Sequence, residues 1–130
     1  LASWQAAELL GAQERGGVII NMSWDHVLTG MGGRNPELFA AVKGGVLAFS
    51  KSLARSLAPR VRVNVIAPGW IGTAFASAAD ERRRHIIADA TPLKRWGTPD
   101  DVAGAAVFLA SPAAAFITGQ TILVGGGVVM

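Results

Sequence analysis

Apolar and polar positions follow two different periods along the 130-residue chain. Helical spacing, with apolar side chains every three to four positions, runs through residues 1–13, 36–58 and 99–110. Short apolar runs rich in β-branched residues occupy positions 18–22, 62–67 and 120–124. Strands of this kind are typically buried on both faces, as in a parallel sheet. The order, helix then strand three times over, predicts an α/β fold in which helices cross over a parallel sheet.

The helix ends carry capping signals. Asn35 is the expected N-cap of the middle helix, and Pro36 takes its first position. Thr98 and Pro99 repeat this pattern, and Asp101 stands where it completes a capping box. A further short helix is expected around residues 78–88. The apolar side of the middle helix is expected to comprise Phe39, Val42, Val46, Phe49 (or Leu47), Leu53 and Leu57.

Three strands are few for a sheet of this kind. The first strand would expose an unpaired apolar edge, which natural proteins cover. We expect that edge to pair either with strands of a preceding N-terminal half or with another subunit. The length suits one domain, and the chain starts at Leu1 rather than at Met. We therefore expect residues 1–130 to form a single domain that is part of a longer product.

The composition excludes several classes of protein. The chain is 51% hydrophobic and 16% charged, so it is not intrinsically disordered. Without cysteine it has no disulfide framework, cysteine zinc site or thiol nucleophile, and we name no metal ligands. This composition is compatible with the reducing cytoplasm, where we expect the protein. No uninterrupted apolar run reaches the roughly 18 residues of a membrane helix, so no membrane partner is expected.

A nucleic-acid partner is not expected either. The net charge is only +3, and the one dense basic run, residues 81–85, begins with an acid. A solvated helix face explains this run better than a phosphate-binding stripe. The tryptophans are scattered along the sequence, so packing explains them better than a stacking platform. They are Trp4, Trp24, Trp70 and Trp96.

Several stretches, in order over roughly 110 residues, carry a resemblance to a known family. They are Gly17–Ser23, Ala40–Gly45, Phe49–Ala54, Val63–Gly69, Phe108–Ser111 and Ile117–Gln120. Together they resemble the C-terminal half of a short-chain dehydrogenase/reductase, of the type that includes the 3-oxoacyl-carrier-protein reductases. The resemblance implies a partial Rossmann-like, doubly wound parallel sheet of three C-terminal strands with crossover helices.

The family's dinucleotide cradle has no counterpart in this chain. Its glycine motif, which holds the pyrophosphate at a helix N-terminus, follows the first strand of the family's fold. That strand belongs to the half that would precede Leu1. The resemblance therefore implies NAD or NADP as cofactor if the N-terminal half exists, and no cofactor otherwise.

The family's chemistry depends on a Tyr-x-x-x-Lys motif, which places a phenol and an ammonium one helical turn apart. The cation lowers the pKa of the phenol, which passes a proton while hydride moves to or from the nicotinamide. Here Phe39 occupies the tyrosine position, four residues before Lys43, and the chain has no tyrosine. The standard acid/base step therefore cannot occur. One subgroup of the family, the dienoyl-CoA reductases, works without this tyrosine, so a different route stays open.

The family's catalytic serine has a weaker counterpart. Ser23 lies sixteen residues before Phe39, whereas the family spacing is thirteen. An insertion in the glycine-rich loop would restore Ser23 to the site; otherwise it ends the strand and caps a turn. Asp25 and His26 follow at the carboxyl end of the strand, where ligands bind in open α/β sheets. They form a substitute acid/base unit only if the two side chains meet, and adjacent loop residues often point apart.

The resemblance also assigns a cofactor-binding set. Lys43 matches the lysine that holds the nicotinamide ribose, the alternative being a surface lysine. Pro68, Gly69, Ile71 and Thr73 resemble the loop over the nicotinamide, with Thr73 bonding the carboxamide or a phosphate. A plain turn after the strand is the alternative for this loop.

Two functions from different classes follow. The first is an NAD(P)-dependent oxidoreductase fragment, impaired because Phe39 replaces the tyrosine and the glycine motif is missing. The second is a non-catalytic pseudoenzyme that acts through assembly. The family's subunits pair through helices matching residues 1–13 and 36–58, and again through the last helix and strand. A homo-oligomer, dimer or tetramer, is therefore the expected partner in either case.

Overall fold

The computed structural model describes residues 2–33, 35–74 and 81–130. The described residues fold into the predicted order of helices and strands, with two short 3-10 helices added among them. The elements are α1 (Ala2–Ala12), β1 (Gly17–Met22), η1 (Asp25–Val27), α2 (Pro36–Leu57), β2 (Val61–Pro68), α3 (Glu81–Ala90), α4 (Pro99–Ala110), η3 (Pro112–Ala114) and β3 (Thr121–Val124).

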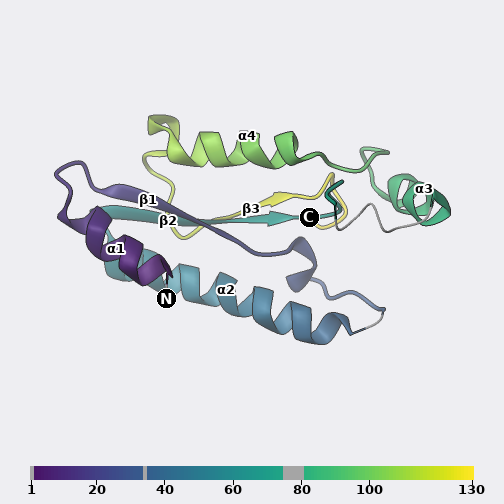
Figure 1. Cartoon of the computed structure of the whole chain (residues 1–130), viewed down its shortest axis with the longest axis horizontal. Coiled ribbons are helices and arrows are strands. Elements are labelled where there is room, and N and C mark those ends of the chain that lie inside the picture. Colours follow the sequence, from purple (N-terminus) through teal and green to yellow (C-terminus); the bar gives the residue numbers. More distant parts are fainter. Residues whose placement is uncertain (1, 34, 75–80) are drawn as a thin grey trace.

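The three strands form one parallel sheet in the order β1-β2-β3. Helices α1 and α2 cover one face and α4 covers the other (Figure 1). The α/β fold with a doubly wound parallel sheet is therefore confirmed. In the described residues no strand pairs with the outer edge of β1.

The central strand β2 builds a core on each face of the sheet. Val61 and Val63 pack with residues of α1, β1 and α2, among them Leu53. On the other face Ile66 packs with Leu109 of α4. Both faces of the strand are covered, which explains why its apolar run shows little alternation.

Two polar side chains of β2 also lie on the α4 face. Arg62 donates to the carbonyl of Leu109 at 2.9 Å. The fully buried Asn64 donates to the carbonyl of Ile117 at 2.9 Å and accepts from the backbone N–H of Gln120 at 3.0 Å. The Arg62 bond satisfies a carbonyl at the end of α4, and the Asn64 bonds satisfy backbone groups of the segment that leads into β3.

The predicted apolar side of α2 is only half right. Leu53 is buried, but Phe39 is 50% exposed and Val42 is 66% exposed. The reason is the length of the helix: Lys43 already contacts the last residue of β1, so the turns before it lie beyond the strand. Helical periodicity continues there without a sheet to cover it.

The capping predictions have different outcomes. The Thr98–Asp101 capping box is confirmed, with the Asp101 N–H donating to Thr98 at 3.3 Å and the Thr98 N–H to Asp101 at 2.7 Å. Asn35 does precede α2, but it has a φ of 58° and makes no side-chain capping bond. Asn35 is therefore confirmed as the N-cap residue, although its side chain does not supply the capping hydrogen bond.

The expected short helix is confirmed as α3, and residues 78–80 of that expectation lie outside the described residues. None of its residues is buried, which confirms the solvated face. Among the described helices, none is both long and apolar enough to cross a membrane.

Candidate active site at the carboxyl edge of the sheet

The three strands end at one edge because they are parallel. Met22, Pro68 and Val124 are their last residues, and the register pairs Pro68 with Val124. Three segments therefore meet at this edge: η1, the loop after β2 and the glycine turn after β3. This is where open α/β sheets bind ligands.

The structure joins Ser23 to the helix that carries Lys43. The Ser23 hydroxyl is buried and donates to the backbone carbonyl of Lys43 at 2.8 Å. The Ser23 N–H donates to the carbonyl of Ile66 at 2.8 Å, so the residue also continues the pairing of β1 with β2. The Ser23 hydroxyl is therefore engaged in a hydrogen bond within the fold. The residue itself follows the last residue of β1.

Phe39 and Lys43 lie on the same face of α2, as their spacing predicts. The Lys43 ammonium is 5.7 Å from the centroid of the Phe39 ring and 3.4 Å from the carbonyl oxygen of Met22. The Phe39 ring is half-exposed and makes an edge-to-face contact with Trp24, at 5.0 Å between centroids. The Phe39–Lys43 pair has an ammonium group, but the Phe39 ring carries no hydroxyl that could exchange a proton.

Asp25 and His26 do meet, although adjacent loop residues often diverge. Nδ1 of His26 lies 2.6 Å from Oδ1 of Asp25, and the same oxygen accepts the backbone N–H of His26 at 2.7 Å. Asp25 is fully buried and His26 is 8% exposed. Oδ2 of Asp25 has no hydrogen-bond partner among the residues that the structure describes.

Three tryptophans that are far apart in the sequence line up around His26. The His26 ring stacks on Trp24 at 5.0 Å and 24°, and it meets the edge of Trp70 at 6.3 Å. Trp70 continues to Trp96 at 5.6 Å. These ring contacts agree with the expectation that the tryptophans pack within the protein. The fourth, Trp4, packs on Phe49.

The loop after β2 is held by hydrogen bonds to the end of β3 and to the segment before α4. Gly69 donates its N–H to Val124 at 3.0 Å, and Gly72 donates to Gly97 at 2.9 Å. Ile71 forms an isolated parallel bridge with Gly97. Thr73 is exposed, and its N–H donates to the carbonyl of Ile71 at 2.9 Å. Backbone hydrogen bonds thus fix the positions of Gly69, Ile71 and Gly72.

The residues present fit the nicotinamide–ribose end of a dinucleotide. The partly exposed Lys43 ammonium has three donors, and its bond to the Met22 carbonyl is long at 3.4 Å, so it can still donate to sugar hydroxyls. The Thr73 hydroxyl, on an exposed loop, supplies a donor for an amide or phosphate oxygen. The sequence holds no glycine motif for the pyrophosphate.

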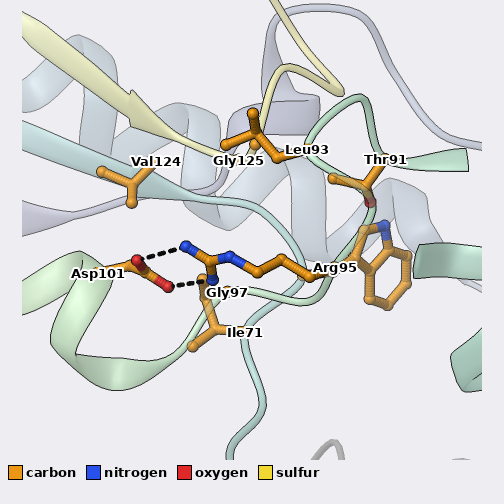
Figure 2. A pocket seen from close by; sticks show the side chains of 10 residues that line it. Ile71, Thr91, Leu93, Arg95, Gly97, Asp101, Val124 and Gly125 are labelled. Carbon is orange, nitrogen blue, oxygen red and sulfur yellow. Dashed lines mark hydrogen bonds and ion pairs between the residues drawn. The ribbon is translucent and has the colours of Figure 1, made fainter. Parts of the chain in front are cut away.

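A small cavity lies behind this edge, between the loop after β2 and the N-terminus of α4. Its volume is about 90 Å³, which is too small for a nucleotide. Figure 2 shows the Arg95 side chain extended to Asp101, with two hydrogen bonds of 2.7 and 2.8 Å. These bonds, followed by the one from the Thr98 N–H, hold the pKa of Asp101 well below its ordinary value. The pair fixes the start of α4 against the site.

Sequence reasoning did not find the space that Asp25 occupies. A Cβ on Gly69 would lie 2.6 Å from Oδ2 of Asp25, and one on Gly125 would lie 2.5 Å from it. The signal available in the sequence was a glycine directly after β2 and another directly after β3, together with an aspartate shortly after β1. No group of three or more residues able to hold a metal ion is found among the described residues.

Comparison with known proteins gives consistent matches. The family model described as enoyl-(acyl carrier protein) reductase matches residues 2–129. Nodulation protein G of Azospirillum brasilense is 45% identical over 116 residues, which are 88% of this chain and 46% of that protein. The 3-oxoacyl-(acyl-carrier-protein) reductase FabG of Vibrio harveyi is 44% identical over 119 residues, 91% of this chain and 48% of that protein.

A solved structure agrees. The short-chain dehydrogenase/reductase (glucose/ribitol dehydrogenase) of Brucella melitensis superposes with a TM-score of 0.87 and 34% identity, covering 99% of this chain and 52% of that one. The chain thus spans about half the length of the relatives it matches. By its sequence, its parallel sheet and its matched family model, the chain belongs to the short-chain dehydrogenase/reductase family.

Proposed function

We propose that residues 1–130 are the C-terminal half of an NAD(P)-linked oxidoreductase of the cytoplasm, in which the family's tyrosine route is closed. The N-terminal half, with the pyrophosphate cradle, would pair with the free edge of β1. The observation that carries the proposal is the helix position of Lys43, whose ammonium reaches the end of β1 while Phe39 stands one turn before it.

The residues of the site have separate roles in this proposal. Lys43 donates to the ribose hydroxyls of the nicotinamide nucleotide, and Thr73 to its carboxamide or a phosphate. Pro68, Gly69 and Ile71 form the surface on which the nicotinamide lies, and Ser23 fixes α2 to the end of β1. The nicotinamide, when bound, accepts or supplies a hydride. Phe39 cannot exchange a proton, so the tyrosine-dependent step is impaired.

Cofactor binding tests this proposal directly. In the full gene product, NADH or NADPH should raise the melting temperature, because a ligand that binds only the folded state stabilises it. Lys43→Ala should remove most of that rise. Lys51→Ala is the matched control, since Lys51 is an exposed lysine on the same helix and should leave the rise unchanged. A wild-type protein whose melting temperature ignores both cofactors would refute the proposal.

The impairment has its own test in Phe39→Tyr. Restoring the phenol four residues before Lys43 should raise NAD(P)-linked turnover by at least about tenfold, since a placed general acid contributes 10²–10⁴-fold. No rise, with cofactor binding intact, would show that the missing tyrosine does not limit the reaction.

A second candidate function is assembly without catalysis. Large apolar side chains are exposed on α1 and α2, among them Leu9 at 70% and Leu38 at 76%. Others lie on α4 and after it, with Val107 at 70% and Phe116 fully exposed. Exposed apolar surface of this kind favours an interface, here a homo-oligomer. Sedimentation of a stable monomer at micromolar concentration would count against it, and a cofactor-dependent melting temperature would favour the first candidate.

A further inference from the structure

The fold encloses the carboxylate of Asp25 completely. It is fully buried at the meeting point of three segments, and the glycines after β2 and β3 leave the space that it fills. Neither Gly69 nor Gly125 has a φ in the left-handed region. At Gly125 the backbone conformation would therefore accept a side chain, and the carboxylate is what excludes one; at Gly69 a Cβ would meet the Cα of Gly125, at 2.8 Å, as well as the carboxylate.

This burial is costly unless the carboxylate is paired. A buried carboxylate needs a cation or several hydrogen bonds to offset its lost hydration. Oδ1 of Asp25 is bonded to both the backbone N–H and Nδ1 of His26. Oδ2 has no partner among the described residues. The imidazole is therefore the group that this arrangement orients and supports.

The orientation of His26 leaves one nitrogen for chemistry. Because Nδ1 faces the carboxylate, the neutral imidazole carries its proton there and its lone pair on Nε2. Nε2 makes no hydrogen bond to any described residue, and 10% of the side chain is open to solvent. Trp24 and Trp70 hold the ring from two sides, which limits its rotation.

The imidazole is connected through Trp24 to Phe39, which stands at the position of the family's phenol. Trp24 contacts both the His26 ring and the Phe39 ring, each at 5.0 Å between centroids. Of the other polar groups at this edge, Ser23 gives its proton to the Lys43 carbonyl and the Lys43 ammonium lies beside Met22. His26 is the neighbouring side chain with a nitrogen suited to proton exchange.

We propose that His26 is the proton-carrying catalytic residue of this site and that Asp25 is its positioning residue. The inference rests on the proposed oxidoreductase function. In the oxidation of an alcohol, Nε2 takes the hydroxyl proton while the carbon-bound hydrogen leaves with its electron pair for NAD or NADP, and the C=O bond forms. In reduction the pair arrives at the carbonyl carbon and Nε2–H protonates the oxygen. The carboxylate of Asp25 stabilises the imidazolium in both directions.

A resonance experiment on the full gene product tests this without relying on turnover. The chain has two histidines, and His85 is exposed beside Asp89 on α3. In a His85→Gln background the imidazole signals in this part of the protein belong to His26. We expect a proton on Nδ1 in the free protein and a shift of the ring signals when NADH or NADPH saturates the site. Ring signals that ignore a bound cofactor would overturn the proposal.

Turnover provides the second measurement, with a panel of small secondary alcohols and NAD or NADP. His26→Gln should lower kcat by about 10²–10⁴-fold with little change in KM, and Asp25→Asn should lower kcat in the same direction. His85→Gln should match the wild type. A folded His26→Gln enzyme that keeps wild-type kcat would overturn the proposal. If the wild type turns over no member of the panel, the ring signals decide. If neither cofactor changes the melting temperature, the proposed function itself has failed, which is a distinct result.

Discussion

The space around Asp25 allows one prediction to be worked out from the structure, the cost of Gly125→Ala. The new Cβ would lie 2.5 Å from Oδ2, whereas ordinary contact begins at about 3.4 Å, so the oxygen must retreat by about 0.9 Å. Movement of Oδ2 is restricted because Gly69 lies against the same oxygen. In addition, the other carboxylate oxygen, Oδ1, is held by two hydrogen bonds to His26. Overpacking of this kind costs about 1–3 kcal/mol.

Part of that cost is offset in the unfolded state, where alanine has less conformational freedom than glycine by about 0.4–1 kcal/mol. The net loss should be about 1–2 kcal/mol, because the φ of Gly125 lies outside the left-handed region. Urea unfolding followed by tryptophan fluorescence measures it, and the midpoint should fall by about 0.5–1 M.

Two variants separate the clash from a general glycine effect. Gly104→Ala is the matched control, since Gly104 lies inside α4 with nothing within 4 Å of its Cβ position. It should stabilise the protein by about 0.5–1 kcal/mol. In an Asp25→Ala background, Gly125→Ala should lose its cost, because the opposing oxygen is gone. An equal cost in both backgrounds would refute the reasoning.

Three further outcomes follow from other contacts. Thr98→Ala should cost about 1 kcal/mol in thermal unfolding, because it removes the N-cap of α4. Asp101, whose pKa is lowered by Arg95, stabilises the fold above the pKa of about 3.9 for an unfolded aspartate, and this is lost as the pH falls below it. Asp101→Asn should therefore be less stable than the wild type at pH 7, with the gap closing toward pH 2 in urea titrations. Asn64→Leu removes the partner of the Gln120 N–H and one of the two donors to the Ile117 carbonyl, which keeps its bond from Arg62. The cost should be about 1–3 kcal/mol, and amide hydrogen exchange at Gln120 should accelerate.

Local sequence determined the elements of this fold. The strands appear where β-branched apolar runs occur, and α4 begins at Thr98 because the capping box is made by residues three apart. The position of Lys43 one turn after Phe39 is likewise a property of helix geometry, so the candidate pair could be named from the sequence. Each of these features depends on neighbours within one turn or one strand.

The contacts around Asp25 depended on the tertiary structure alone. Residues 25, 69 and 125 are brought together only because three parallel strands end at the same edge. The same holds for the row of Trp24, His26 and Trp70, and for the exposure of Val42, where α2 runs past the sheet. Periodicity describes one element at a time, whereas burial and pairing are decided by how far each element extends over its neighbours.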